Sequence, residues 1–493
     1  MDPGTDAAGA RIPSLDPDAL SEARTVLDAA GYTPAGLAGR IGTGPNLRLR
    51  AHDVARARAV LRDDRPLDVL ASLFLLGADA DRAAATVALG SGAGTLIAAG
   101  LAEDVDGRLR PLLQLVPHDD LIVASDVIEP EPGPDFVPGV QAPSDLLARL
   151  TPRQRIGRAL DVGTGCGIQA LLLARHADEV VATDVSPRAL AIARVNAALN
   201  RTSGIDFRLG GLLEPIGDER FDLVVANPPY VISPEHTFVF RDAMGRGDEL
   251  VRELVRGLPR MLADRGLAII LVSWVAGDGP PPPLSWTTEP GCGRLLLASR
   301  IQSAPDSAHT WNKDRAADQD AYEERIRRWL RFYEQEGIES IGFGALVLSA
   351  EDRGRPAWAA TVGAPLEGPG PAGPHVLRLV AGHAALAAAG GRVGKVGRLV
   401  LAPDAELLER RRRGPGGLET LGIEIRLPGG IGAAADLDAG GALLAAAFEE
   451  PRTAREAVAN AAARLGVEAS AIEDAGTALI RSLLVNGFVE LAP

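Results

Sequence analysis

The middle third of the chain alternates short apolar runs with longer segments of helical periodicity. The runs ALDVG, EVVATD, IDFRLG, FDLVVA and GLAIILVSW have the length and composition of strands. The segments between them, including GIQALLLARHA and PRALAIARVNAALN, have the spacing of helices. This alternation predicts an α/β fold, in which helices cover a parallel sheet. In such a sheet a ligand binds at the carboxyl ends of the strands.

The first third has a helical pattern instead. The segment SEARTVLDAAG ends on Gly31, and LDVLASLFLLG ends on Gly77. A helix of small residues follows, and then two short strand-like runs meet at a turn, Asp106-Gly107. A turn of this kind after two helices is typical of the wing of a winged helix. We therefore expect a helical domain over residues 1–128, with a winged helix as one interpretation of it.

The last fifty residues repeat the order helix, helix, strand. Thr95–Glu103 (TLIAAGLAE) aligns without gaps with Ser482–Glu490 (SLLVNGFVE). The match reflects either a shared ancestor or the common way in which a helix ends on glycine before a strand. We expect an α+β accessory domain over 351–493, with a winged helix at its end as the alternative. Residues 129–350 then form the α/β domain.

Charge is unevenly distributed along the 493 residues. There are 51 Lys and Arg against 65 Asp and Glu, a net charge of −14, and residues 1–150 hold 13 basic and 22 acidic residues. No segment is basic enough to bind nucleic acid through bulk charge alone. The one basic cluster is Arg410–Arg413, which we interpret as a solvated helix end; the alternative is contact with a phosphate or an acidic partner.

Composition also narrows the class of protein. Two cysteines cannot form a disulfide framework or a four-thiolate zinc site, and the seven histidines do not recur at ligand spacing, so we expect no metal site. The most apolar stretch, 266–277, is shorter than the roughly 20 residues that span a bilayer. The N-terminus lacks the apolar core of a secretory signal. We expect a soluble cytoplasmic protein with no membrane contact.

A glycine-rich turn follows the first strand of the α/β pattern. Three glycines at alternate positions let the backbone turn tightly and approach a ligand closely. The spacing is not the G-x-G-x-x-G of dinucleotide sites, and the aspartate before the turn suits a ligand that carries an ammonium group. The alternative is a turn that only packs helix against strand. The candidate residues are Asp161, Gly163, Thr164, Gly165 and Gly167.

An acidic residue, Asp184, ends the next strand, about twenty residues further on. A carboxylate at this position can accept hydrogen bonds from both hydroxyls of a ribose. The alternative role is the N-cap of the helix that starts at Pro187, although Ser186 is already placed to fill it.

The fourth strand is followed by Asn227, Pro228, Pro229 and Tyr230. Two consecutive prolines fix φ and remove two backbone donors, so that carbonyl oxygens are left to accept hydrogen bonds. The NH2 group of a substrate could donate to the Asn227 oxygen and to the Pro228 carbonyl, with Tyr230 as an aromatic wall. The alternative is an ordinary proline turn.

Together, DVGTGCG, Asp184 and NPPY resemble the class I S-adenosylmethionine-dependent methyltransferases that methylate amino groups. These include release-factor glutamine, ribosomal-RNA guanine-N2 and DNA adenine-N6 enzymes. The resemblance covers roughly residues 141–350 and is specific for the chemistry rather than the substrate. It implies a Rossmann-like sheet and S-adenosyl-L-methionine as cofactor. It further implies that Gly163–Gly167 cradles the methionine part, that Asp161 meets its amino group, that Asp184 holds the ribose, and that Asn227 with Pro228 orients the acceptor nitrogen.

The sequence departs from this family at one position. Where relatives often have G-D-L-x-E-P after the third strand, this chain has GGLLEP, so Gly211 replaces the aspartate that would bind the adenine amino group. We expect backbone contacts from Gly211 and Leu212 there instead. Ser144, in the segment that precedes the first strand, is a further expected cofactor contact.

The expected function is therefore methyl transfer to a planar amide or amino nitrogen. We favour a protein glutamine side chain as acceptor, and so a protein partner. The alternatives are an exocyclic amine of RNA or DNA, and a winged-helix regulator whose core only senses the cofactor. The amphipathic segment 321–337 is expected to pack on the core or to shape a substrate lid. The sequence does not determine the oligomeric state.

Overall fold

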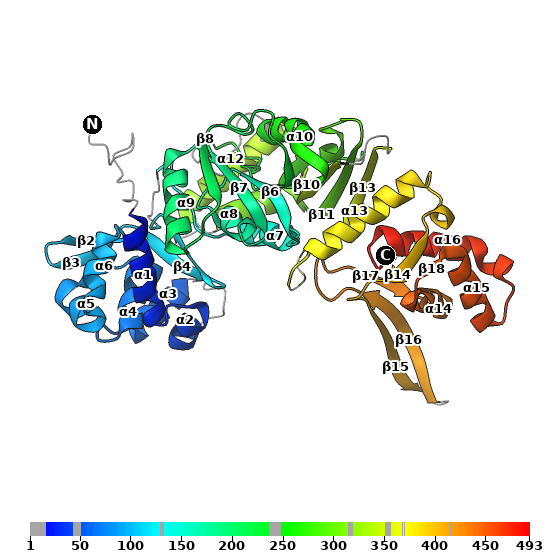
Figure 1. The fold of residues 1–493 in the computed structure, drawn as a ribbon, viewed down its shortest axis with the longest axis horizontal. Coiled ribbons are helices and arrows are strands. Elements are labelled where there is room, and N and C mark those ends of the chain that lie inside the picture. Colours follow the sequence, from blue (N-terminus) through cyan, green and yellow to red (C-terminus); the bar gives the residue numbers. More distant parts are fainter. Residues whose placement is uncertain are drawn as a thin grey trace.

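The structure is a computed structural model that describes residues 16–42, 51–128, 133–235, 248–279, 281–313, 319–350, 356–366, 368, 370–414 and 417–493. The N-terminal and C-terminal parts lie on opposite sides of a central α/β part (Figure 1). No helix among these residues is long and apolar enough to cross a membrane.

The central part is built on an eight-stranded sheet with the order β13-β11-β12-β10-β9-β6-β7-β8. Strands β6 to β10 are parallel, whereas β12 runs antiparallel to both of its neighbours. The expected α/β, Rossmann-like fold is confirmed. The strands are β6 (Ile156–Val162), β7 (Ala177–Asp184), β8 (Ile205–Leu209), β9 (Phe221–Ala226), β10 (Leu262–Val275), β11 (Cys292–Ser303), β12 (Ser340–Ala350) and β13 (Trp358–Gly363).

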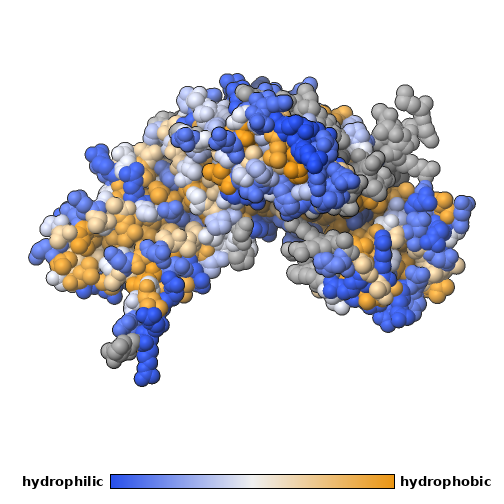
Figure 2. Space-filling model, turned by 180° about the vertical axis from the view of Figure 1, so that it is seen from behind, coloured by the Kyte–Doolittle hydropathy of each residue, from blue (hydrophilic) through white to orange (hydrophobic). Residues whose placement is uncertain are grey.

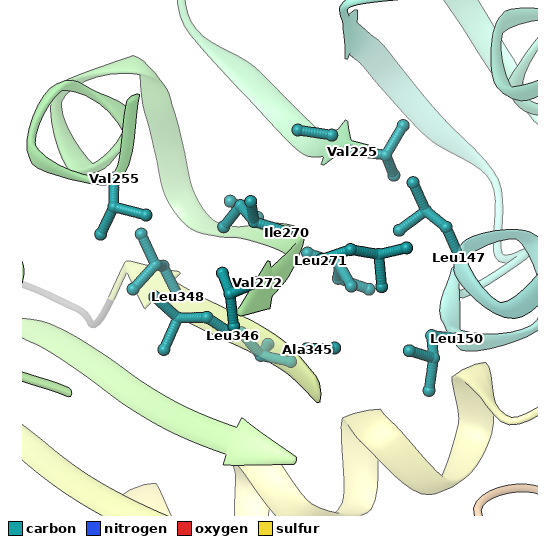
Figure 3. Packing of buried hydrophobic residues seen from close by; sticks show 14 of the residues in the cluster. Leu147, Leu150, Val225, Val255, Ile270, Leu271, Val272, Ala345, Leu346 and Leu348 are labelled. Carbon is teal, nitrogen blue, oxygen red and sulfur yellow. The ribbon is translucent and has the colours of Figure 1, made fainter. Parts of the chain in front are cut away.

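Helices cover both faces of this sheet, and its central strands accordingly contain continuous apolar runs, such as Leu223–Ala226 in β9 and Leu267–Val272 in β10. Figure 3 shows side chains of β10 and β12 between Val255 on α10 and Leu147 and Leu150 on α7. The helices of the central part are α7 (Ala142–Leu150), α8 (Ile168–Leu173), α9 (Pro187–Leu199), α10 (Glu249–Met261), α11 (Ala304–Asn312), α12 (Gln319–Gln335) and α13 (Gly373–Ala388).

The N-terminal part is mainly helical and ends in a small sheet with the order β1-β3-β2. Asp106 and Gly107, both with positive φ, form the turn between β2 and β3. The winged-helix interpretation stays a prediction, and this strand order supports it. The elements are α1 (Pro17–Ala29), α2 (Pro34–Ile41), α3 (Ala51–Val60), α4 (Pro66–Leu70), the π-helical turn Ala71–Leu75, β1 (Ala80–Asp81), α5 (Arg82–Leu89), α6 (Gly92–Ala98), β2 (Ala102–Val105) and β3 (Arg108–Pro111).

The C-terminal part contains a second small sheet with the order β18-β14-β19. The matching sequence segments fall on α6–β2 and on α16–β19, but the middle strand of this second sheet comes from β14, upstream in sequence. The elements are β14 (Arg398–Leu401), β15 (Glu406–Gly414), β16 (Gly417–Arg426), β17 (Ala434–Leu437), α14 (Ala439–Ala446), β18 (Arg452–Thr453), α15 (Ala454–Leu465), α16 (Ala469–Val485) and β19 (Val489–Leu491).

Two features differ from or extend the expected organisation. Arg410–Arg413 lies in strand β15 and not at a helix end, so that expectation is wrong. Because the four arginines pair with the antiparallel strand β16, which contains several β-branched and apolar residues, strand pairing overrides their helix propensity. Strand β13 pairs with β11, so the central sheet extends past residue 350. The division into three domains stays a prediction.

Two asparagines join the N-terminal part to the central part. Strand β5 (Leu121–Ser125), which forms a hairpin with β4 (Gln114–His118), lies along α9. The Asn200 amide accepts from the Ile122 N–H (2.9 Å) and donates to the Ile122 carbonyl (2.8 Å). The Asn196 amide makes the same pair of bonds with Ala124, at 2.6 and 2.9 Å. The two asparagines are four residues apart on a helix, which is a rise of about 6 Å, and their two partners are two residues apart on a strand, which is about 7 Å. The two spacings therefore match.

Apolar packing reinforces this junction. Leu20 and Leu27 of α1 belong to the same buried cluster as Ile192 and Val195 of α9. The N-terminal part therefore shares a core with the face of the α/β part that carries α8 and α9, and the two fold as one packed unit there.

We predict that Asn196→Ala lowers the free energy of unfolding by about 2–3 kcal/mol, because it leaves buried backbone groups of Ala124 without partners. Urea titration followed by circular dichroism measures the change. Asn486→Ala, which removes an exposed helix-end contact, is the control and should cost about 0.5 kcal/mol or less. Equal costs for the two variants would contradict the role of the asparagine pairing.

Candidate active site

One row of the sheet brings the sequence motifs together. Val162, the last residue of β6, pairs with Thr183 of β7 on one side and with Ala226 of β9 on the other. The glycine turn, Asp184 and Asn227 each begin one residue beyond this row. The three motifs therefore leave the sheet side by side at its carboxyl edge, where ligands bind in this fold.

The glycines of the turn have two different roles. Gly163, Gly165 and Gly167 all have positive φ, of 71°, 54° and 85°. A Cβ atom at Gly167 would lie 2.9 Å from the Cβ of Ala193 on α9, so this glycine is needed for helix packing. Cβ atoms at Gly163 and Gly165 would meet nothing within 4 Å. These two positions leave backbone open to a ligand.

Asp161 is a buried carboxylate with one oxygen to spare. Its Oδ2 accepts from the Thr164 hydroxyl (2.6 Å) and from the Ala170 N–H (3.1 Å). Its Oδ1 has no hydrogen-bond partner in the part of the chain that the structure describes. Burial raises the pKa of Asp161 to about 7, against the two hydrogen bonds, which lower it. A cationic ligand would offset the cost of burying this charge, so the site fits an ammonium group.

Asp184 is tied directly to the glycine turn. Its Oδ2 accepts from the Gly165 N–H (2.8 Å) and its Oδ1 from the Ser186 N–H (2.9 Å). Burial raises the pKa of this carboxyl above its usual range. The Ser186 hydroxyl accepts from the Ala189 N–H and caps α9, so Asp184 is not needed as the cap. Each Asp184 oxygen keeps a second lone pair, which could accept from a hydroxyl.

Asn227 and Tyr230 have different surroundings. Within the described residues, the Asn227 side chain has no hydrogen-bond partner, and it is partly exposed. Tyr230 is 4% exposed, and its ring centroid lies 5.4 Å from that of Phe343 and 6.1 Å from that of Trp311. Burial raises its pKa. Tyr230 thus anchors the turn in an aromatic group, and the binding of a ligand by the Asn227 amide stays a prediction.

The turn after β8 lies next to Asp184. The Gly210 N–H donates to the Asp184 carbonyl (3.0 Å), and the Gly211 carbonyl accepts from Glu214 N–H (3.0 Å). Leu212 has a positive φ of 47°, and a Cβ atom at Gly211 would meet nothing within 4 Å. The backbone at Gly211 is therefore accessible at the position where related methyltransferases often have an aspartate. The contacts of Gly211 and Leu212 with an adenine stay a prediction.

Ser144 lies in the first turn of α7. Its carbonyl accepts from the Gln169 side chain of α8 (2.7 Å), which fixes this segment to the helix that begins at the glycine turn. Contact of the Ser144 side chain with the cofactor stays a prediction.

Sequence reasoning missed the residues that hold the segment after Tyr230. Glu235 has a side chain only 7% exposed and forms ion pairs with Arg325 and Arg328 of α12. The Tyr333 hydroxyl of the same helix donates to the Ile232 carbonyl (2.9 Å). Of the two roles expected for segment 321–337, the structure shows core packing, since Trp329 and Tyr333 are buried. The signal in the sequence was the position of Arg325 and Arg328, which are three residues apart and close to these aromatic residues on the same predicted helix.

The fold and this site define a class I S-adenosylmethionine-dependent methyltransferase domain. Residues 138–272 match the model of the family described as Methyltransferase small domain. Residues 29–112 match a family described as Domain of unknown function (DUF7059). The family resemblance predicted from the motifs, and with it the cofactor class, is confirmed. Among the described residues, no group of three or more His, Cys, Asp or Glu could hold a metal ion.

Curated relatives match the central part. Release factor glutamine methyltransferase of Koribacter versatilis is 38% identical over 115 residues, which are 23% of this chain and 39% of that protein. The protein of the same name from Xylella fastidiosa is 35% identical, over 24% of this chain and 48% of that one. Ribosomal RNA small subunit methyltransferase C of Salmonella arizonae is 33% identical, over 32% and 45%. The chain thus spans less than half the length of these relatives.

We predict that the affinity for S-adenosylmethionine rises between about pH 5 and pH 8, because Asp161, with a pKa of about 7, must lose its proton to attract an ammonium group. Asp161→Asn should weaken binding by about tenfold or more and remove this pH dependence. Titration calorimetry at several pH values measures both. Asp206→Asn, at an exposed residue of β8, is the control.

The same pKa has a consequence for the ligand-free protein. The unfolded carboxyl ionises near its ordinary pKa, while the folded one keeps its proton up to about pH 7. The Asp161 contribution to stability therefore falls as pH rises through this interval. A ligand affinity independent of pH in the unaltered protein would contradict the assigned role.

We predict that Glu235→Gln increases hydrogen exchange of the backbone amides of residues 231–235 by about tenfold or more, because two arginines of α12 lose their buried counter-charge. Mass spectrometry of the exchanged protein measures it. Glu324→Gln removes exposed ion pairs of the same helix and should leave the exchange unchanged. Similar exchange in both variants would show that Glu235 does not hold this segment.

Proposed function

We propose that this protein is an S-adenosylmethionine-dependent N-methyltransferase that acts on a planar amide or amino nitrogen. The observation that carries the proposal is the pairing of Val162 with Thr183 and Ala226, which sets the Asn227 amide beside the glycine turn and Asp161. This amide has no hydrogen-bond partner among the residues that the structure describes. A protein that only senses the cofactor would have no use for an acceptor-binding amide at this place, so the regulator alternative is disfavoured.

The residues divide the work of the reaction. Bound S-adenosylmethionine supplies an electrophilic methyl group on its sulfonium. Asp161 would hold the ammonium end, and Asp184 the ribose hydroxyls. The Asn227 oxygen and the Pro228 carbonyl would accept from the two hydrogens of the acceptor NH2. The nitrogen lone pair is delocalised, and two fixed acceptors would favour the nitrogen as it gains positive charge. The N–C bond would form as the bond between methyl and sulfur breaks, with S-adenosylhomocysteine as the leaving group, and the nitrogen would then lose one proton to water. Alignment with the methyl group supplies proximity.

For the acceptor we favour a protein glutamine. Several relatives are named release factor glutamine methyltransferase, and the acidic N-terminal part, which is fixed to α9, disfavours a nucleic acid on that side of the site. A protein substrate in the cytoplasm follows from this proposal. The second candidate is an exocyclic amine of a nucleic acid, which a relative named ribosomal RNA small subunit methyltransferase C favours.

We predict that Asn227→Ala lowers methyl transfer by about 100-fold or more and leaves the Kd for S-adenosylmethionine within about twofold, because the amide contacts the acceptor and not the cofactor. Transfer of labelled methyl groups into a cell extract measures the activity, and calorimetry measures the Kd for S-adenosylmethionine. Asn486→Ala, far from the site in sequence and at a helix end, is the matched control.

The same assay separates the two acceptors. Label that survives nuclease and is released by protease supports a protein glutamine, and the reverse result supports a nucleobase. Full methyl transfer by Asn227→Ala would refute the mechanism whichever acceptor is labelled.

A further inference from the structure

A two-stranded ribbon, β15 and β16, extends from the C-terminal part (Figure 1). Only the inner end of β16, from Ile423 to Arg426, pairs with β17. Residues 409–413 and 417–421 are exposed, so the outer half of the ribbon has both faces in solvent. Figure 2, which shows the molecule from behind, has hydrophilic residues toward the outer end of this ribbon.

The outer half carries four consecutive arginines. Successive side chains of a strand point to opposite faces, so Arg410 and Arg412 lie on one face and Arg411 and Arg413 on the other. Arg411 lies 3.3 Å from a carboxylate oxygen of Glu409. The other three arginines have no ion-pair partner within the part of the chain that the structure describes.

The cross-strand neighbours compensate only part of this charge. Arg410 lies opposite Gly422, Arg411 opposite Thr420, and Arg413 opposite Leu418, while only Arg412 lies opposite an acidic residue. Neighbouring like charges repel one another, so this arrangement does not stabilise the ribbon. Charged side chains on an edge strand also prevent aggregation, which is the alternative reason for arginines here. Residues 409–421 hold four arginines against Glu409 and Glu419, so a surplus of two positive charges is left for an anionic ligand.

We propose that the outer ribbon is an arm that enters the major groove of duplex DNA. That groove is about 12 Å wide and admits a two-stranded β-ribbon. Its two walls are lined by phosphates, which match arginines on both faces of the arm, and the arginine fork suits phosphate oxygens. The inference goes beyond the proposed function and does not depend on which nitrogen accepts the methyl group.

Two other partners fit less well. The major groove of an RNA helix is too deep and narrow for side chains to enter. A stable protein interface needs an apolar core, and the outer ribbon offers only Leu418 and Leu421 as large apolar side chains. In a DNA groove these leucines would meet thymine methyl groups.

The test uses the full chain and a fluorescent DNA duplex of about two helical turns, with binding followed by anisotropy at several salt concentrations. Replacing Arg410, Arg412 and Arg413 by Ala should weaken binding at least tenfold at low salt. It should also reduce the slope of log Kd against log salt by about 2–3, since each phosphate contact contributes about 0.9 on B-DNA. The Lys variant of the same three residues should keep most of the slope.

The matched control replaces three other exposed arginines, Arg256, Arg455 and Arg464, by Ala, which changes the net charge equally. It should bind like the unaltered protein. No binding of duplex DNA, or the same loss in both triple variants, would overturn the proposal. Tighter binding of a single-stranded RNA or of a polyglutamate peptide would overturn it too. Cofactor binding and Asn227-dependent methyl transfer are measured separately, so either proposal can fail alone.

Discussion

The site depends on one constraint, the pairing of Val162 with both Thr183 and Ala226. Parallel pairing in this register makes three strands end at one level. The glycine turn, Asp184 and Asn227 are therefore brought together by backbone hydrogen bonds before any ligand binds. The bond from the Gly165 N–H to Asp184 then fixes the turn to the neighbouring strand. Slippage of one strand would separate the groups that we propose to act on one ligand.

The parts outside the α/β domain are joined to it in different ways. Asn196 pairs with β5 and also donates to the Cys166 carbonyl (2.8 Å), so the N-terminal part contacts the glycine turn through one side chain. On the far side of the site, α12 holds the segment after Tyr230 through Glu235. In the C-terminal part, β15 and β16 form an arm exposed on both faces. The three motifs thus lie in the central part, while the N-terminal part, α12 and the β15–β16 arm are three separate elements around it.

Sequence periodicity determined the α/β fold, because strands buried on both faces must be apolar throughout and the helices between them must be amphipathic. The positions of the three motifs at the ends of strands were also predicted from sequence, because a tight turn needs glycine and two consecutive prolines leave carbonyl acceptors free. The role of Asp161 as a carboxylate for an ammonium group was inferred from its position alone and stays a prediction. These are local requirements of backbone and chemistry, and a single chain records them.

Only the tertiary structure decided which residues meet across long sequence separations. Glu235 and Arg328 are 93 residues apart, and Ala124 and Asn196 are 72 apart, so no local pattern marks either contact. The arginines Arg410–Arg413 fit a helix as well as a strand by themselves, and the pairing of β15 with β16 settled the choice. The middle position of β14 between β18 and β19 likewise follows from packing. Sequence by itself recorded what each residue can do, while the register and packing of distant segments determined the groups with which it acts.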